Sequence, residues 1–103
     1  MVQTVILKKK LADRSGEGRN GHYCFARYIG EFTEEAANGP VIHSVIIECS
    51  AKRFKVAEID KIVGTATTLE CNVSLDVRSY NNDYFQEVNV YIRNREYQIE
   101  REY

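Results

Sequence analysis

The chain has 103 residues, 44% hydrophobic and 28% charged, and its 14 lysines and arginines nearly balance its 15 aspartates and glutamates. This composition excludes a disordered or fibrous chain and indicates a single domain, since domains cluster at ~100 to 150 residues. A net charge of −1 excludes a molecule whose whole surface attracts phosphate backbones. No apolar run approaches the ~20 residues of a membrane helix and no signal peptide is recognisable, so we expect a cytoplasmic protein without membrane contact.

Two strands are predicted in the first third of the chain. Residues 3–11 begin with β-branched residues and end near a run of lysines, which is typical of a strand that leaves the core. Residues 13–21 are rich in Gly and charge and end in Asn20-Gly21, so they predict a loop and a hairpin turn. Residues 22–32 form a long aromatic strand, in which Gly30 predicts a bulge or a bend.

One strand and the only predicted helix follow. Residues 33–40 are predicted to be a loop because they end in Asn-Gly-Pro. Residues 41–49 are almost wholly apolar and β-branched, which predicts the most buried strand. Residues 54–63 place their apolar side chains at helical spacing, and Gly64 caps the end of this short helix.

A second hairpin closes the predicted domain. Residues 67–79 alternate cleanly between apolar and polar side chains, residues 80–83 predict a turn, and residues 84–93 return as a strand. The tail, residues 94–103, also alternates. The sequence leaves open whether this tail is a sixth strand, an interface strand or a frayed end.

The order of these elements predicts the fold class. An OB-fold is a five-stranded, partly open barrel, and its helix lies between the third and fourth strands, as the predicted helix does here. Immunoglobulin-type sandwiches and SH3-like barrels join these strands by turns instead. We therefore predict a mainly β protein, with a five-stranded OB-fold barrel and one short helix over residues 1–93. A C-terminal extension, strand or flexible, occupies residues 94–103.

Two segments resemble the small OB-fold single-stranded DNA-binding proteins of bacteria, phages and mobile elements. They are RSGEGRNGHYCFARYIGEF and LECNVSLDVRSYNNDYFQEVNVYIRN. The resemblance covers about residues 3–93 and lies in residue types: a Gly-rich first hairpin, an aromatic strand and a last hairpin carrying "RSY" and "YF". It implies sequence-nonspecific binding of single-stranded DNA and a homo-oligomer, with a dimer favoured. Bacterial members usually end in a long disordered tail with an acidic tip that recruits partners. These 103 residues contain no such tail, so that role is not expected.

Other kinds of site find less support in the sequence. Residues 16–21 spell GxGxxG, but a strand follows where a dinucleotide-binding loop needs a helix, so a hairpin tip is expected. The cysteines lack CxxC spacing, which favours core packing over zinc or disulfide bonds; they are Cys24, Cys49 and Cys71. His43 shares its strand face with apolar residues and is expected to be hydrogen-bonded in the core. No catalytic constellation is found, so we expect neither an enzyme nor a cofactor.

Aromatic and basic residues supply the predicted site, because single strands bind by stacking bases on flat side chains beside cations. The candidate residues are Arg14, Arg19, Tyr23, Phe25 and Arg27 in the first hairpin and Arg78, Tyr80, Tyr84 and Phe85 in the last. Aromatic residues also fill barrel cores, so the sequence does not decide which face of residues 22–32 is buried. RNA stays open as a ligand beside DNA. The alternative function is a non-catalytic protein-interaction module that oligomerises through an exposed strand such as the tail.

Overall fold

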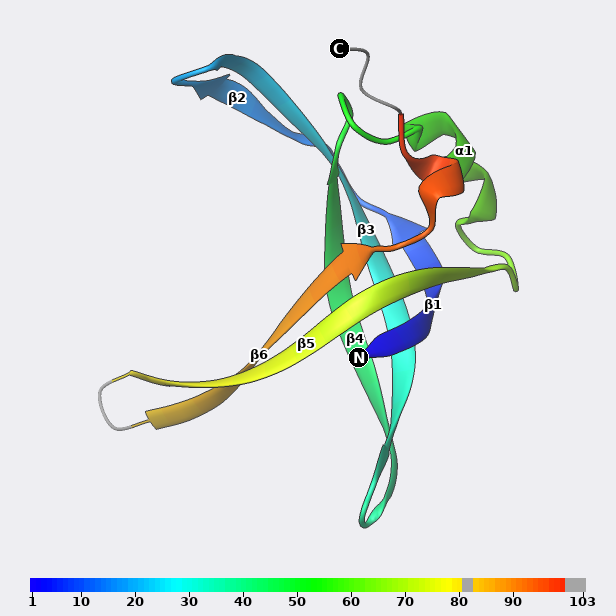
Figure 1. Cartoon of the computed structure of the whole chain (residues 1–103), viewed down its shortest axis with the longest axis vertical. Coiled ribbons are helices and arrows are strands. Elements are labelled where there is room, and N and C mark those ends of the chain that lie inside the picture. Colours follow the sequence, from blue (N-terminus) through cyan, green and yellow to red (C-terminus); the bar gives the residue numbers. More distant parts are fainter. Residues whose placement is uncertain (81–82, 100–103) are drawn as a thin grey trace.

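The computed structural model describes the backbone of residues 1–80 and 83–99 and the side chains of residues 1–75 and 88–99. The described chain is mainly β with one α-helix (Figure 1). Its elements are β1 (Val2–Lys10), β2 (Arg14–Gly18), β3 (Gly21–Ala36), β4 (Gly39–Ser50), α1 (Val56–Ile62), β5 (Thr68–Tyr80), β6 (Asp83–Ile92) and the 3-10 helix η1 (Arg95–Tyr97).

The strands form one antiparallel sheet in the order β2-β3-β1-β5-β6, with β4 also paired to β3. At 16 residues, β3 is long enough to pair with β2 over residues 21–25 and with β1 over residues 28–31 along one edge, and with β4 over residues 25–36 along the other. Three hairpins project from this arrangement, formed by β2–β3, β3–β4 and β5–β6 (Figure 1). The open sheet therefore packs on a small core and extends well beyond it.

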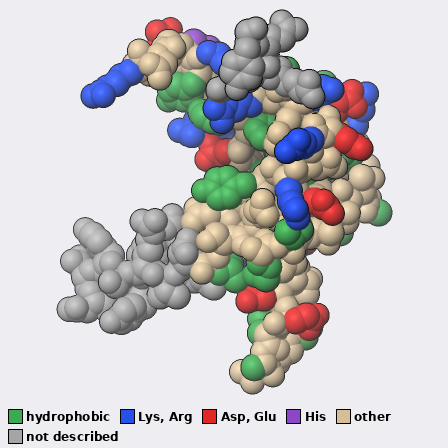
Figure 2. All heavy atoms as spheres, in the orientation of Figure 1, with side chains coloured by type: hydrophobic (Ala, Val, Ile, Leu, Met, Phe, Trp, Pro, Cys, Tyr) green, Lys and Arg blue, Asp and Glu red, His purple; other side chains and the backbone are tan. Residues whose placement is uncertain are grey.

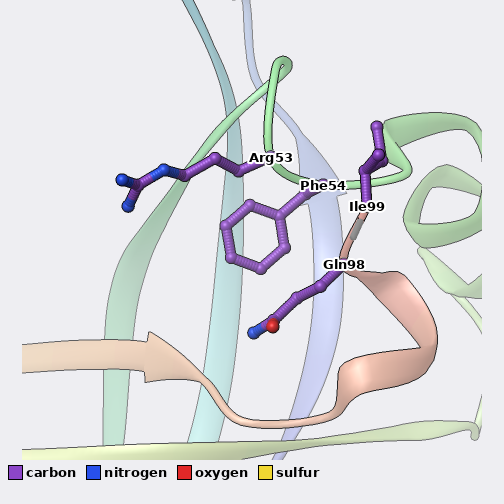
Figure 3. Close-up of a pocket in the computed structure, with 4 residues that line it drawn as sticks. All are labelled: Arg53, Phe54, Gln98 and Ile99. Atoms are coloured by element: carbon purple, nitrogen blue, oxygen red, sulfur yellow. The ribbon is translucent and has the colours of Figure 1, made fainter. Parts of the chain in front are cut away.

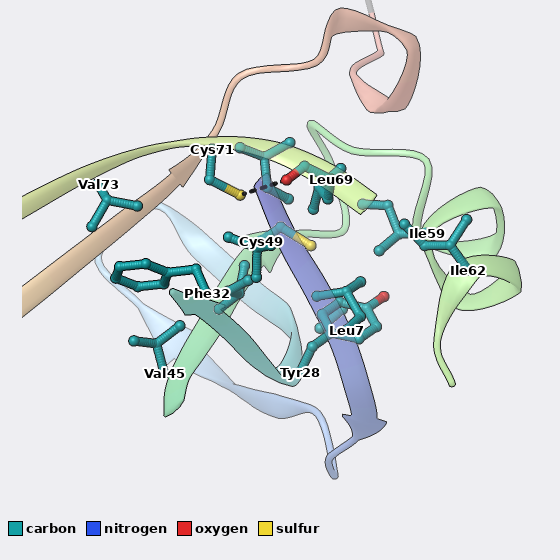
Figure 4. Close-up of a cluster of buried hydrophobic side chains, with 14 residues drawn as sticks. Leu7, Tyr28, Phe32, Val45, Cys49, Ile59, Ile62, Leu69, Cys71 and Val73 are labelled. Carbon is teal, nitrogen blue, oxygen red and sulfur yellow. Dashed lines mark hydrogen bonds between the residues drawn. The ribbon is translucent and has the colours of Figure 1, made fainter. Parts of the chain in front are cut away.

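The core contains the inward side chains of the sheet together with one face of α1 (Figure 4). Its fully buried members include Val5, Leu7, Tyr28, Ile47, Ile59 and Leu69. The hydroxyl of Tyr28 donates to Asp60 Oδ1 of α1 at 2.7 Å, and Lys10 Nζ lies 3.1 Å from the same carboxylate oxygen. This polar link satisfies the buried hydroxyl of Tyr28 and ties α1 to β1 and β3.

The helix lies where the sequence predicts it, between the strands of residues 39–50 and 68–80. Ile59 and Ile62 point into the core because they lie on one face of α1. Gly64 has a φ of +75°, a conformation that side chains rarely adopt, and its N–H donates to Leu7 O at 2.9 Å. The glycine thus ends the helix and attaches the following segment to β1.

Residues 13–21, predicted to be a loop, contain strand β2. The Gly-rich segment is extended because β3 continues beyond the core and offers its edge as a partner, so pairing overrides local composition. The turn has Arg19 and Asn20 at its centre, between the paired residues Gly18 and Gly21. It therefore lies one residue earlier than Asn20-Gly21 predicts, and Gly21 takes the positive φ of +100°.

The prediction that residues 33–40 are a loop is also wrong. β3 continues to Ala36, a two-residue turn follows, and β4 begins at Gly39. Nor is β4 the most buried strand, since Ile42 is 69% and Ile46 is 53% exposed. Residues 41–49 are apolar on both faces, but only the face that Val45, Ile47 and Cys49 share is buried in the core, and Ile42 and Ile46 on the other face meet solvent.

Gly30 is not itself the site of a bulge. The register of the β1–β3 ladder shifts on β1, between Leu7 and Lys9, and Gly30 stays in regular pairing with Val45 of β4. A Cβ at position 30 would lie 2.7 Å from Val5 Cγ1. Glycine is needed here because β1 and β3 pack too closely for a side chain.

The described part of the tail folds back onto the domain. After η1, Gln98 forms an isolated bridge with Phe54, and Lys55 N–H donates to Tyr97 O at 2.6 Å. Residues 94–99 are thus a turn with a short bridge, rather than the sixth strand that alternation allowed; residues 100–103 lie outside the described residues. No helix in the described part of the chain is long and apolar enough to cross a membrane.

Candidate nucleic-acid interface

The two faces of β3 differ in burial, which answers the question that the sequence left open. Ala26, Tyr28 and Phe32 point into the core and are at most 3% exposed. The alternate residues Tyr23 and Phe25 are half-buried on the outer face, as is Arg27. The register of the β2–β3 and β3–β4 ladders extends this face over three strands, because directly paired residues share a face. We call this surface the outer face.

Tyr23 and Phe25 lie next to each other on the outer face, with ring centroids 5.8 Å apart and planes tilted by 51°. Gly16 of β2 pairs with Tyr23, and a Cβ at position 16 would lie 2.6 Å from the Tyr23 hydroxyl. The glycine therefore lets the tyrosine ring lie against the backbone of β2. The ring occupies space that any other residue at position 16 would fill.

Arg14 of β2 pairs with Phe25 and lies over both rings. Its guanidinium carbon is 4.9 Å from the Phe25 ring centroid and 5.8 Å from that of Tyr23. Arg14 Nε also donates to Glu48 Oε2 at 2.8 Å. The cation is thus held above the aromatic pair by a carboxylate of β4.

The other two arginines of this hairpin have no ion pair with any described residue. Arg19 is exposed at the β2–β3 turn. Arg27 pairs with Glu48 in the ladder, yet no described carboxylate lies within ion-pair distance of it, and its buried Nε has no hydrogen-bond partner there. Two positive charges near the aromatic pair thus have no carboxylate partner among the described side chains.

Five of the nine predicted site residues therefore belong to one hairpin, and four of them gather on the outer face. Arg14, Tyr23, Phe25 and Arg27 lie together, while Arg19 lies at the turn. The last hairpin pairs Arg78 with Phe85 and Ser79 with Tyr84. The side chains of its four predicted site residues, Arg78, Tyr80, Tyr84 and Phe85, lie outside the described residues.

A hollow of about 270 Å³ adjoins the outer face where β4 and β6 approach each other. It is lined by Phe25 and Glu48 together with Arg53, Phe54 and Tyr91. In Figure 2 the molecule is hollowed on the left of the view, and hydrophobic, basic and acidic side chains border that hollow from above. Tyr91 is 64% exposed, so its ring is largely free of the core.

Sequence reasoning missed Arg53, Phe54 and Tyr91 as site residues. The signal for the first two is the run KRFK, residues 52–55, in which a phenylalanine is flanked by cations directly after a strand. The helical spacing of residues 54–63 assigned Phe54 to the helix instead. Tyr91 lies at an outward position of its predicted strand, but an outward tyrosine alone does not indicate a ligand.

The buried titratable groups belong to the core rather than to a site. Burial, and then the hydrogen bond to Asp60, raise the pKa of Tyr28 above its ordinary value of 10.0. Burial raises the pKa of the Cys49 thiol to about 11 and that of Cys71 to about 12. These thiols are protonated at neutral pH and pack as apolar groups, as predicted, whereas Cys24 is half-buried.

His43 also has a structural partner. Its Nε2 lies 2.6 Å from Glu34 Oε2, and its ring stacks on Phe32 with centroids 4.9 Å apart. The prediction of a hydrogen-bonded histidine is confirmed. Within the described residues, no three His, Cys, Asp or Glu side chains are grouped so that they could hold a metal ion.

Searches with protein-family models, among curated proteins and among solved structures found no match to this chain.

Proposed function

We propose that this chain is a non-catalytic protein that binds single-stranded DNA without sequence specificity on its outer face. The observation that carries the proposal is the pair Tyr23 and Phe25, which are adjacent and half-exposed, with Arg14 above them. Stacking on aromatic rings is worth ~1 to 3 kcal/mol per base and tolerates every base, because each has a flat face. Arg19 and Arg27 supply cations for the phosphates.

The strand order supports the OB-fold as the finer description of the architecture. β1, β3 and β4 follow one another as an antiparallel meander, β1 also pairs with β5, and α1 lies between β4 and β5. An OB barrel would close between β4 and β6. Cys49 and Ser50 of β4 line the same hollow as Val90 to Ile92 of β6, which is consistent with a barrel left partly open there. In this description β2 is an extension of the first hairpin.

The charges on the outer face bear on the expected affinity. The molecule carries a net charge of −1, and Glu48 lies within the proposed site. Binding should therefore depend on a few local cations and should weaken steeply as salt rises, because each neutralised phosphate releases counterions. Three free thiols suit the reducing cytoplasm, where we place the protein.

A fluorescence-anisotropy titration with labelled oligothymidine, at low and at moderate salt, tests the proposal. Phe25→Leu keeps an apolar side chain and removes the ring, so it should weaken binding by about fivefold or more. Arg27→Gln should weaken binding. It should also lower the slope of the logarithm of the binding constant against the logarithm of salt concentration, by the amount that about one phosphate contact contributes. Lys61→Gln on α1, which removes an exposed charge paired with Glu58, is the matched control and should bind like the wild type.

Absence of binding even at low salt would overturn the proposal, as would equal affinities for Phe25→Leu and the wild type. Oligouridine in the same titration decides between DNA and RNA. The outer face offers stacking and charge to both, and a preference of the wild type for oligouridine would replace DNA by RNA as the ligand.

Self-association is a second candidate function, and the free edge of β4 favours it. β4 has no ladder on its other edge among the described strands, and it exposes Ile42 and Ile46 on the outer face. Ala36 and Gly39 close a two-residue turn as a hydrogen-bonded pair. Because such pairs alternate along the ladder, the N–H and C=O groups of Ile42, Ser44 and Ile46 point away from β3.

The sequence of β4 is complementary to itself about Ser44. If two copies pair antiparallel with Ser44 opposite Ser44, Ile42 of each copy lies opposite Ile46 of the other on the same face. The only charged residue of β4, Glu48, then lies opposite Pro40 and meets no like charge. We propose a two-fold dimer through this edge, in place of the tail, whose described backbone bonds to residues 53–55.

Light scattering on a sizing column measures the oligomeric state. The wild type should elute as a dimer at high protein concentration, and Ile46→Lys should be monomeric because two lysines would approach the paired edge. Thr4→Lys is the control, since Thr4 is exposed on β1, where it pairs with Glu70 of β5 and lies on a different strand from the β4 edge. A monomeric wild type would overturn this second candidate and leave DNA binding untouched.

A further inference from the structure

A second hollow, of about 250 Å³, lies where the loop after β4 meets the tail. It is lined by Arg53, Phe54, Gln98 and Ile99 (Figure 3). The backbone holds its walls together, because Ile99 N–H donates to Arg53 O at 2.6 Å and Phe54 and Gln98 form a bridge. The hollow is therefore a fixed part of the fold rather than a gap between loose side chains.

Of the described side chains that line the hollow, three extend in the same direction. Figure 3 shows the Phe54 ring between the side chains of Arg53 and Gln98, while Ile99 points away from them. The Gln98 amide has no hydrogen bond with any described residue, and Arg53 has no ion pair with one. The hollow thus presents an aromatic ring, an amide and a cation to the same space, and the described residues supply no partner for the amide or the cation.

These three groups match the chemistry of one nucleotide. An aromatic ring stacks on a base, an amide pairs with a donor and an acceptor on the edge of a base, and a guanidinium binds phosphate. The volume is also informative, since pockets for drug-sized ligands measure ~300 to 1,000 Å³. A hollow of about 250 Å³ suits a single planar ring system with its phosphate left outside.

The hollow is continuous with the outer face. Arg53 and Phe54 also line the neighbouring hollow, which reaches Phe25 and Tyr91. Aromatic rings therefore occur along one path, from Tyr23 and Phe25 past Tyr91 to Phe54. A strand stacked on the outer face would bring one of its terminal bases to Phe54.

We propose that this hollow is a base-reading subsite at one end of the single-strand site. The inference rests on the proposed function. One base stacks on Phe54, the Gln98 amide forms two hydrogen bonds with its edge, and Arg53 binds the adjoining phosphate. Adenine is the base that glutamine pairs with most often in this bidentate manner, through an acceptor and an adjacent amino donor. The protein thus adds a preference for adenine at one position to binding that is otherwise nonspecific.

The test replaces single thymines by adenine along an oligothymidine and measures each oligonucleotide by competition anisotropy. An oligonucleotide with adenine at one position near an end should bind the wild type about fivefold more tightly than oligothymidine does. This factor corresponds to the lower end of the discrimination that one bidentate pair provides. Gln98→Leu has similar size and no amide, so it should abolish this preference and keep the affinity for oligothymidine. Phe54→Leu should weaken every oligonucleotide that reaches the subsite.

Gln3→Leu, on β1 and remote from the hollow, is the matched control and should keep the preference. Thermal unfolding followed by circular dichroism verifies that each variant is folded. If the wild type binds oligothymidine but shows no adenine preference, or if Gln98→Leu retains it, the subsite is refuted while the proposed function stands. If no oligonucleotide binds at low salt, the proposed function fails, and the subsite fails with it.

Discussion

Arg14 and Glu48 form an ion pair directly above an aromatic ring: Arg14 Nε lies 2.8 Å from Glu48 Oε2, and its guanidinium carbon lies 4.9 Å from the centroid of Phe25. The pair lies at the centre of the outer face. A carboxylate at this position opposes phosphate binding twice, because it repels phosphate and because it occupies Arg14. Both effects disappear when the carboxylate is neutralised.

Glu48→Gln should therefore tighten binding of oligothymidine at low salt, by up to about fivefold, which corresponds to ~1 kcal/mol for an exposed ion pair. The gain should shrink as salt rises, since salt screens the repulsion. Anisotropy titrations measure both effects. Glu58→Gln on α1 removes the same charge from an exposed pair with Lys61 and is the control. Unchanged or weaker binding of Glu48→Gln would contradict the proposed position of the phosphates.

Gly16→Ala should displace the Tyr23 ring without unfolding the protein. The new Cβ would lie 2.6 Å from the Tyr23 hydroxyl, at the far end of a side chain that can rotate away. We expect DNA binding to weaken by about fivefold, because the loss of ~1 kcal/mol of stacking corresponds to that factor. The thermal stability should change little. Gly18→Ala is the matched control, because its Cβ would lie at an ordinary 3.6 Å from Tyr23 Cδ1. Equal affinities for the two variants would show that Tyr23 is not a stacking residue.

Gly30→Ala should destabilise the fold. Its Cβ would lie 2.7 Å from Val5 Cγ1 and 3.1 Å from Ile47 Cδ1, both within the core. Overpacking of this kind typically costs ~1 to 3 kcal/mol. Urea unfolding should therefore show a lower midpoint for Gly30→Ala than for Gly18→Ala on the exposed hairpin. A midpoint equal to that of the wild type would mean that β1 and β3 are less closely packed than described.

Stability should fall at alkaline pH because of the two buried thiols, joined above pH 10 by the Tyr28 hydroxyl, whose pKa burial also raises. In the unfolded chain Cys49 and Cys71 ionise near the ordinary pKa of 9.0, whereas the folded pKa values are about 11 and about 12. The folded state therefore holds more protons above pH 9, and each thiol lowers the free energy of unfolding by about 1.4 kcal/mol per pH unit until its folded pKa is reached. Urea midpoints should be level from pH 7 to 8.5 and should fall from pH 9 to 11.

Cys71→Ala tests whether the buried thiols cause this loss of stability at alkaline pH. It should have a lower stability at neutral pH, because it leaves a cavity, and a shallower decline above pH 9, because one of the two thiols is gone. The decline, rather than the absolute stability, is the quantity to compare. An equally steep decline in Cys71→Ala would assign the alkaline loss to other groups.

The predictions that hold rest on local pattern. The helix, predicted over residues 54–63 and found at Val56–Ile62, was predictable because Ile59 and Ile62 lie on one face, and the alternation of residues 67–79 predicts the buried Leu69 and Cys71. The predictions that fail depend on long-range pairing. β2 is a strand because β3 extends beside it, and Ile42 and Ile46 are exposed because only the opposite face of β4 packs against the core.

The candidate site was predictable in part for the same reason. Tyr23, Phe25 and Arg27 share a face by simple alternation, but only the packing of Tyr28 and Phe32 decides that this face points outward. The subsite at Phe54 was beyond prediction, because it joins residues separated by 44 positions through one bridge. Local spacing carries no information about such a contact.

Ultraviolet cross-linking of oligothymidine to the wild-type protein, followed by mass spectrometry of the joined peptide, tests the central claim most directly. Thymine stacked on the outer face should join to the peptide that contains Tyr23 and Phe25, and Phe25→Leu should reduce the yield. Contact along the proposed path predicts a second cross-link at Phe54 or Tyr91. Cross-links confined to α1, or none under conditions of saturating DNA, would contradict a single-strand site on the outer face.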